Sequence, residues 1–255
     1  MLIYVAPMLL ASRGIEIREA GGVKASAPGY DGSAIRSFAG RGAVASATMR
    51  QVQQVAGFVL AGGESSRMGR DKSLLELGGV PLLARTARLV ESVAGPPTVV
   101  GGAVLSGSLG WRVIADDWPG AGPLGGIATA LAASSAPWNL VVACDLPHLT
   151  QAWLAYLVER ALASQGDAVL PMSARGAEPL CAMYHQRCAP AIRAALAQGT
   201  RKVTEGLQSV LVEMIGPLEW KGFDSEGLLF KNMNSPEDYE EARARLGERE
   251  RPGKK

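Results

Sequence analysis

Short apolar runs alternate with amphipathic segments along the chain from about residue 54 onward. The first run, VAGFVL at residues 55–60, is short and carries β-branched residues, which is typical of a buried strand. In residues 81–94, apolar side chains recur at spacings of four, three and four, with arginines on the other side. That period predicts an amphipathic helix that opens at Pro81.

The same alternation continues to the end of the chain. Thr150 and Ser235 each precede a helical pattern as N-cap residues. Strands are expected in residues 97–102, 111–115, 138–145, 167–172 and 179–185, and helices in residues 125–134, 150–165, 188–199 and 234–246. Alternating strands and helices predict an α/β fold: a three-layer, Rossmann-like, mostly parallel sheet with helices on both faces. Ligands of such sheets bind outside the carboxyl ends of the strands.

The N-terminal segment differs from the rest because it is rich in Gly, Ala and Ser and has no sustained period. We therefore expect residues 1–52 to be a disordered leader or the result of a misassigned start, with Met49 as the true initiator. Residues 53–247 are expected to form one catalytic domain, and residues 248–255 a charged tail.

Composition excludes several classes of function. The net charge of +2 is too small for bulk nucleic-acid binding, so a phosphate ligand has to be held by a local cluster. No apolar run reaches the roughly 18 residues of a membrane helix, and no positive residue precedes the apolar start as in a signal peptide. Three cysteines without a CxxC pair favour a reducing compartment. These observations predict a cytoplasmic protein with neither membrane nor nucleic-acid partners.

The stretch LAGGESSRMGRDKS, residues 60–73, places glycines and cations directly after the first strand. It matches neither the GxxxxGK[ST] phosphate loop nor the GxGxxG dinucleotide fingerprint. Gly62 and Gly63 nevertheless allow backbone N–H groups to approach an anion, and Arg67 and Lys72 add positive charge. A nucleotide loop is one interpretation, and an ordinary strand-to-helix turn with solvated basic residues is the other.

Several motifs together resemble one family. LAGGESSRMGRDK is similar to the signature LAGGxSxRMGxDK of molybdenum cofactor guanylyltransferases, which are nucleotidyltransferases. GPLGGI at 122–127, CDLP at 144–147, EPLCAMYH at 178–185 and FKNMNSPEDY at 230–239 agree in order and spacing. The resemblance covers roughly residues 54–246. It implies transfer of GMP from GTP to the terminal phosphate of molybdopterin, with release of pyrophosphate, Mg²⁺ as cofactor and molybdoenzyme chaperones as further partners.

The resemblance also assigns roles around the glycine loop. It implies that the backbone of Leu60, Ala61 and Gly62 holds the nucleotide. Arg67 and Lys72 would stabilise the triphosphate and the leaving pyrophosphate.

Residues after later strands receive roles in the same way. Asp145 would bind Mg²⁺, with a backbone N–H of the next turn as the simpler partner. Asp116 would contact the nucleoside, unless the Asp116–Asp117 pair is only a solvated acidic turn. Relatives often have Asn at the end of the preceding strand, where this chain has Gly101, so that contact would have to come from backbone or from another residue.

Glu178, Asn232 and Asn234 stand where the family is thought to meet the pterin. Asn234 suits equally the turn before the Ser235 cap. The glycines of GPLGGI admit two interpretations: close approach of the base or sugar to a helix N-terminus, or tight packing of that helix on the sheet.

Three other functions remain open. A cytidylyltransferase for the same cofactor is one, although such relatives tend to read LAAG where this chain reads LAGG, and glycine at position 62 leaves more room for a purine. A sugar-phosphate nucleotidyltransferase is another, but those enzymes usually carry longer substrate domains. The third is a non-catalytic adaptor that delivers cofactor, against which the retained Arg67, Lys72 and Asp145 argue.

Overall fold

The computed structural model describes residues 54–61, 72–101, 110–224 and 226–249. The expectation of a disordered leader in residues 1–52 lies outside these ranges. No helix in the described part of the chain combines the length and apolar character needed to cross a bilayer.

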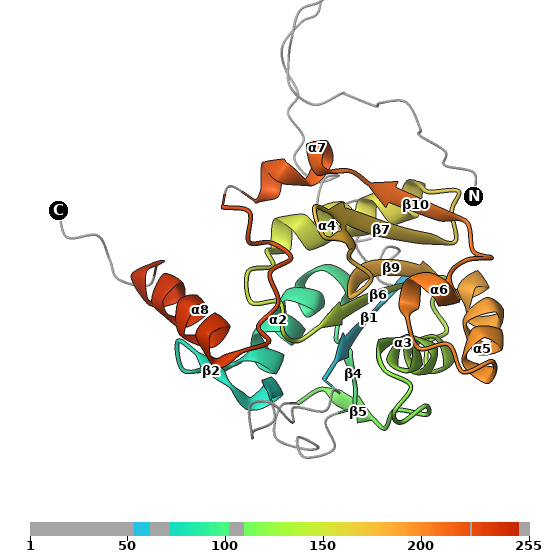
Figure 1. Ribbon diagram of the computed structural model, residues 1–255, viewed down its shortest axis with the longest axis horizontal. Coiled ribbons are helices and arrows are strands. Elements are labelled where there is room, and N and C mark those ends of the chain that lie inside the picture. Colours follow the sequence, from blue (N-terminus) through green and yellow to red (C-terminus); the bar gives the residue numbers. More distant parts are fainter. Residues whose placement is uncertain (1–53, 62–71, 102–109, 225, 250–255) are drawn as a thin grey trace, which may run out of the picture.

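An eight-stranded sheet forms the middle of the molecule, in the order β10-β7-β9-β6-β1-β4-β5, with β8 paired to β7 (Figure 1). Neighbouring strands are parallel except that β9 is antiparallel to β6 and β7, and β8 to β7. The strands are β1 (Val55–Leu60), β4 (Thr98–Val100), β5 (Arg112–Ile114), β6 (Trp138–Ala143), β7 (Ala168–Ser173), β8 (Gly176–Ala177), β9 (Cys181–His185) and β10 (Val212–Ile215).

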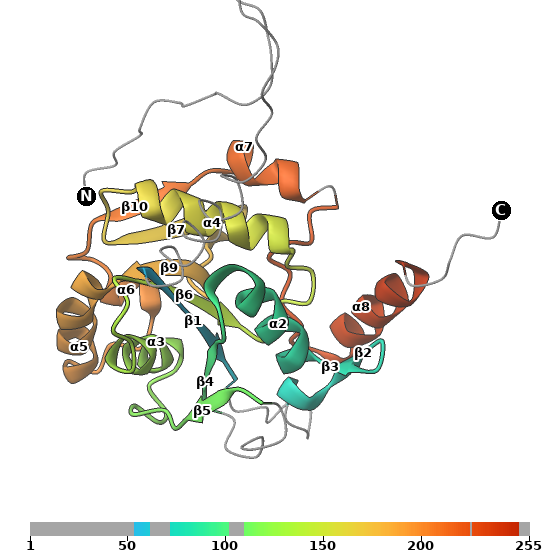
Figure 2. The same ribbon diagram turned by 180° about the vertical axis from the view of Figure 1, so that it is seen from behind.

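Helices cover both faces of this sheet (Figures 1 and 2). One face carries α2 (Leu82–Ala94), α4 (Gln151–Ala163) and the short α7 (Pro217–Trp220), and the other carries α3 (Pro123–Ala132), α5 (Ala189–Ala197) and the short α6 (Val203–Gly206). Single 3₁₀ turns occur at η1 (Lys72–Leu74), η3 (Gln186–Cys188) and η4 (Lys221–Phe223). The expected three-layer, mostly parallel α/β fold is confirmed.

Alternate residues of the strands enter two separate cores. In β1, Val55 and Val59 pack beneath α2 and α4, whereas Phe58 and Leu60 pack beneath α3. β6 is buried along its whole length, as expected for a central strand that is covered on both faces.

The C-terminal helix α8 (Pro236–Arg249) lies beside a small hairpin of β2 (Glu76–Leu77) and β3 (Val80–Pro81), as Figure 1 shows. Ala242 of α8 belongs to a third cluster with Leu77, Leu82 and Met233, and the Tyr239 hydroxyl donates to the carbonyl of Glu76 (2.8 Å). These contacts fix α8 near the N-terminus of α2.

Both predicted caps are confirmed. The Thr150 hydroxyl accepts from the N–H of Trp153 (3.2 Å), and the Ser235 hydroxyl accepts from that of Asp238 (3.2 Å). At two helix ends the structure differs from the sequence pattern. Pro81 lies at the N-cap rather than inside α2 because it still pairs with Glu76 in the hairpin. Helix α8 runs to Arg249, beyond the expected helix in residues 234–246.

Candidate active site

Four parallel strands end level with one another at the carboxyl edge of the sheet. Leu60 of β1 is in register with Val100 of β4 and Ala143 of β6, and Val100 is in register with Ile114 of β5. β7 runs in the same direction because β9 is antiparallel to both β6 and β7. The residues that follow β7, β6, β1, β4 and β5, and those that precede β9, therefore line one edge, in the order β7, β9, β6, β1, β4, β5.

Asp145, the expected Mg²⁺ ligand, lies near the middle of this edge. It is half-buried in the turn that follows β6. The N–H of Cys144 donates to the carbonyl of Leu60 (3.2 Å), and the carbonyl of Asp145 accepts from the N–H of Met233 (2.9 Å). The turn that carries this carboxylate is thus fixed from β1 on one side and from the C-terminal segment on the other.

Asp116 and Gly101, the expected nucleoside residues, lie at the β4–β5 end of the edge. The Asp116 Oδ1 atom accepts from the N–H of Trp118 (3.0 Å) and from the hydroxyl of Thr129 (2.8 Å). Gly101 has a φ of 81°, and its N–H donates to the carbonyl of Ile114 (2.9 Å). That N–H is used within the sheet, so a backbone contact from Gly101 to a ligand has to use its carbonyl.

The residues expected to hold the nucleotide through the glycine loop are only partly described. The Leu60 carbonyl pairs with Cys144, and the Ala61 N–H donates to the carbonyl of Val100 (2.9 Å). The Ala61 N–H is thus used within the sheet. Gly62 and Arg67 lie outside the described residues, and of Lys72 only the backbone, at the start of η1, is described.

Glu178 lies at the β7–β9 end of the edge, on the side of Asp145 away from Asp116. Its carboxylate accepts from the Ser173 hydroxyl (2.6 Å) and forms an ion pair with Arg175 (3.5 Å). Arg175 also donates to the carbonyl of Phe230. The guanidinium therefore joins the β7–β9 connection to the C-terminal segment, and its side chain stays more than half exposed.

The 226–235 segment carries Asn232 and Asn234 along the same edge. It is held by Arg175 at Phe230 and by Asp145 at Met233. Asn232 is half-buried and the side chain of Asn234 is exposed. The N–H of Asn234 donates to the Asp238 carboxylate (3.0 Å), so this residue does belong to the turn before α8. The structure thus brings the expected pterin residues into one region beside Asp145.

The glycines of GPLGGI are explained by packing. A Cβ on Gly125 would lie 2.8 Å from the Cβ of Trp118 and 2.9 Å from its carbonyl oxygen, and one on Gly126 would lie 3.3 Å from the Leu60 side chain. Both residues are buried. Between the two interpretations of this motif, the structure favours tight packing of α3 on the sheet for Gly125 and Gly126. Gly122, with φ 70°, forms the turn before the helix.

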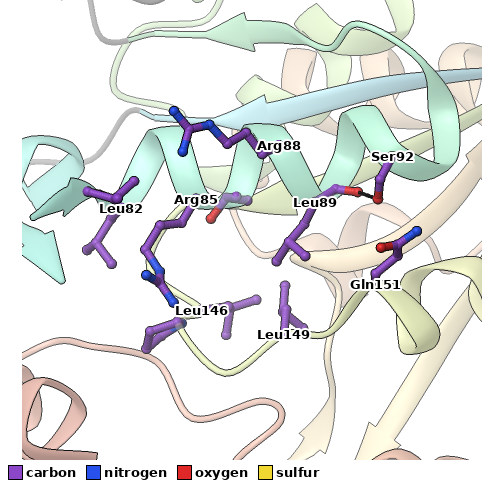
Figure 3. Close-up of a pocket in the computed structure, with 11 residues that line it drawn as sticks. Leu82, Arg85, Arg88, Leu89, Ser92, Leu146, Leu149 and Gln151 are labelled. Atoms are coloured by element: carbon purple, nitrogen blue, oxygen red, sulfur yellow. Dashed lines mark hydrogen bonds between the residues drawn. The ribbon is translucent and has the colours of Figure 1, made fainter. Parts of the chain in front are cut away.

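A cavity of about 290 Å³ lies between α2 and the loop that follows Asp145 (Figure 3). Figure 3 shows Arg85 and Leu89 extending toward Leu146 and Leu149, whereas Arg88 points away. Arg85 donates to the carbonyl of Leu77 (3.2 Å). Because the floor is apolar and Arg85 already has a partner, this cavity does not suit a triphosphate.

Cys181 and Cys188 lie in the two hydrophobic cores. Cys181 and Cys188 are fully buried free thiols, and burial raises the pKa of each to about 12. The sulfur of Cys181 accepts from the indole N–H of Trp153 (3.3 Å). His185 packs edge-on against Trp138, with ring centroids 5.1 Å apart, and burial lowers its pKa. These side chains serve packing.

Two residues of the site region were missed from the sequence. Arg175 sits in the turn between β7 and β8, where a cation is typical of a solvated surface and carries no signal. Thr129 did carry a signal, because it is the only residue with a hydroxyl group within the apolar run GGIATALA. A polar group on a helix that is buried all round has to find a hydrogen-bond partner.

Comparisons with known proteins identify the family of this chain. Residues 57–211 match the family described as "MobA-like NTP transferase domain". A relative from Pelotomaculum thermopropionicum, named "Probable molybdenum cofactor guanylyltransferase", is 34% identical over 203 residues, covering 79% of this chain and 97% of the relative. A protein of the same name from Nostoc sp. is 35% identical over 195 residues, covering 71% of this chain and 86% of the relative.

Solved structures of nucleotidyltransferases share the fold of this chain. Molybdopterin-guanine dinucleotide biosynthesis protein A from Archaeoglobus fulgidus superposes with a TM-score of 0.68 at 26% identity, covering 76% of this chain and 99% of that one. A 2-C-methyl-D-erythritol 4-phosphate cytidylyltransferase from Thermus thermophilus shares the fold, with a TM-score of 0.55 at 18% identity over 74% of this chain and 98% of that one. The chain is therefore a nucleotidyltransferase that belongs to the family of MobA-like NTP transferase domains.

Proposed function

We propose that this enzyme transfers GMP from GTP to the terminal phosphate of molybdopterin and releases pyrophosphate. The observation that carries the proposal is the order of side chains along the carboxyl edge. Asp116 marks one end, Asp145 the middle, and Glu178 with the 226–235 segment the other end. A transfer between two substrates needs such an order: donor nucleoside, reacting phosphate, acceptor.

The spacing of the sheet suits this arrangement. Adjacent strands lie about 4.8 Å apart, so the three steps from β5 to β6 span about 14 Å and the two steps from β6 to β7 about 10 Å. A nucleoside triphosphate laid from the β5 end toward Asp145 would present its α-phosphorus between the two sides. The acceptor would then approach from the β7–β9 side.

In the proposed reaction, an oxygen of the acceptor phosphate attacks the α-phosphorus of GTP while the bond to the bridging α,β-oxygen breaks. The chain's own contribution is to orient the two substrates in line and to offset negative charge. Arg67 and Lys72 are proposed to face the β- and γ-phosphates, where the charge of the leaving pyrophosphate develops. Glu178, Asn232 and Asn234 are proposed to hold the pterin through hydrogen bonds.

The donor set fits Mg²⁺ bound together with a nucleotide. The described residues contain no group of three or more His, Cys, Asp or Glu side chains placed to hold a metal by themselves. Mg²⁺ commonly binds one or two carboxylates and takes its other ligands from water and substrate phosphates. Asp145 would supply that carboxylate. When bound, the ion would neutralise charge on the phosphates.

Titration calorimetry tests the donor half of this proposal. We expect GTP to bind in the presence of Mg²⁺ more tightly than CTP or ATP, and Asp145→Ala to weaken GTP binding at least tenfold. Glu159→Ala, on the exposed side of α4, is the matched control for loss of a carboxylate and should bind GTP as wild type does. Preference for CTP would instead identify a cytidylyltransferase. A folded protein that binds no nucleotide would refute the proposal and leave the adaptor.

A further inference from the structure

Thr129 connects the nucleoside end of the site to helix α3. Its side chain is 1% exposed, and its Oγ1 atom lies at the centre of a small hydrogen-bond network. This oxygen is 2.8 Å from the Asp116 Oδ1 atom, 3.0 Å from the carbonyl oxygen of Gly125, and 3.0 Å from the main-chain nitrogen of Asp117.

The chemistry of a hydroxyl decides how these contacts are used. Thr129 has one proton to donate, and its lone pairs accept from the N–H of Asp117. The two possible acceptors are the Asp116 carboxylate and the carbonyl of Gly125, four residues earlier in the helix. The contact to the carboxylate is the shorter one, and a charged acceptor binds a hydroxyl more strongly than a neutral one. The Thr129 hydroxyl therefore donates its hydrogen bond to the Asp116 carboxylate rather than to the Gly125 carbonyl.

This hydrogen bond commits one oxygen of Asp116 to the protein. Oδ1 accepts from both Trp118 N–H and Thr129, which fixes the rotation of the carboxylate. Among the residues that the structure describes, none donates a hydrogen bond to Oδ2. The second oxygen is thus left as the acceptor for a ligand at the β5 end of the edge.

We propose that Thr129 is a positioning residue for nucleotide recognition: it holds Asp116 so that Oδ2 accepts a hydrogen bond from the nucleoside of the donor nucleotide. This inference rests on the proposed function, because it takes a nucleoside triphosphate as the ligand. Under this inference, Thr129 contributes to the affinity for the nucleoside of the ligand. The affinity for the phosphate chain does not depend on Thr129.

Two probes separate the two ends of the nucleotide. Mg²⁺–GTP reports on the whole ligand, and Mg²⁺–tripolyphosphate reports on the phosphate chain alone. Thr129→Val keeps the shape of the side chain and removes the hydroxyl, whereas Thr129→Ser retains it. We expect Thr129→Val to bind GTP about tenfold more weakly, the effect of losing one hydrogen bond to a charged group, and to bind tripolyphosphate as wild type does. Thr129→Ser should recover GTP affinity to within about threefold.

Controls separate positioning from folding. Ser134→Ala removes a hydroxyl that accepts from the N–H of Ala136 (3.1 Å) at the far end of α3, and it should leave both affinities unchanged. If Thr129→Val does not fold, Thr129→Ala carries the same expectation. In turnover, Thr129→Val should raise KM for GTP while kcat changes little, because the contact is made in the ground state as well as in the transition state.

Four results would overturn the inference. Equal weakening of GTP and tripolyphosphate would show a merely structural role. Unchanged GTP binding by Thr129→Val, or failure of Thr129→Ser to recover it, would separate Thr129 from recognition while leaving the proposed function intact. Wild-type protein that binds tripolyphosphate but gains nothing from the nucleoside would overturn the proposed function and this inference together.

Discussion

Gly57 in the middle of β1 determines how closely α2 approaches the sheet. A Cβ at this position would lie 2.3 Å from the Cγ1 of Val90 and 3.3 Å from the Cβ of Ala94. Carbon atoms prefer about 3.5–4.0 Å, so Gly57→Ala demands more than about 1 Å of extra space. Val90 is fully buried and stiff at χ1, so the side chain cannot turn away and the helix has to move.

The expected cost follows from these distances. Overpacking of this kind destabilises by about 1–3 kcal/mol, and the lower entropy of alanine in the unfolded chain returns about 0.4–1 kcal/mol. We expect Gly57→Ala to lower the free energy of unfolding by about 0.5–2 kcal/mol in urea denaturation followed by circular dichroism. Gly222→Ala is the control because its Cβ meets nothing within 4 Å.

A double-mutant cycle tests the cause. Val90→Ala opens the space that the new methyl group needs, so the double variant should be less destabilised than the sum of the two single variants by about 1 kcal/mol or more. Strict additivity, or a Gly57→Ala variant as stable as wild type, would refute the argument that this contact sets the spacing between β1 and α2.

Three further predictions concern stability and reactivity. Thr150→Ala should lose about 1 kcal/mol of unfolding free energy because the hydroxyl no longer caps the N–H of Trp153; a denaturation midpoint equal to that of wild type would contradict this. The backbone N–H of Asn234 is the main cause that lowers the pKa of the Asp238 carboxyl. The stability that this carboxylate contributes is therefore present above the unfolded pKa of about 3.9, and it is lost as pH falls through the folded value. Wild type should therefore lose stability in acid more steeply than Asp238→Asn, and parallel pH profiles would count against it. Burial raises the pKa of Cys181 to about 12, so a thiol reagent at pH 8 should label it only in denaturant, whereas rapid labelling of native protein would show that it is accessible.

The fold was predictable because its signals are local. The run in β6 and the period of α2 each follow from a few adjacent residues, and so do the caps at Thr150 and Ser235. Elements between residues 200 and 220 gave weaker signals. α6 and α7 have four residues each and are too short to show a helical period. β10 is a strand because it pairs with the outer edge of β7.

The site was predictable only in part. Asp145 and Asp116 each come just after a strand of the parallel part of the sheet, so the general rule for α/β sheets placed them at one edge. Tertiary packing brings Arg175 to Phe230 and Met233 to Asp145, in each case across more than fifty residues of sequence. No local pattern encodes these contacts. The resemblance to a family supplied the expected roles, and the register of the strands supplied the order in which they stand.

The most direct test of the account is release of pyrophosphate from GTP, measured with purified protein, Mg²⁺ and molybdopterin as acceptor. We predict release that requires both Mg²⁺ and acceptor, that is faster with GTP than with CTP, and that falls by orders of magnitude in Asp145→Ala while Glu159→Ala stays at the wild-type rate. Release that continues unchanged in Asp145→Ala, or that occurs only with CTP, would contradict the proposed guanylyl transfer at this edge of the sheet.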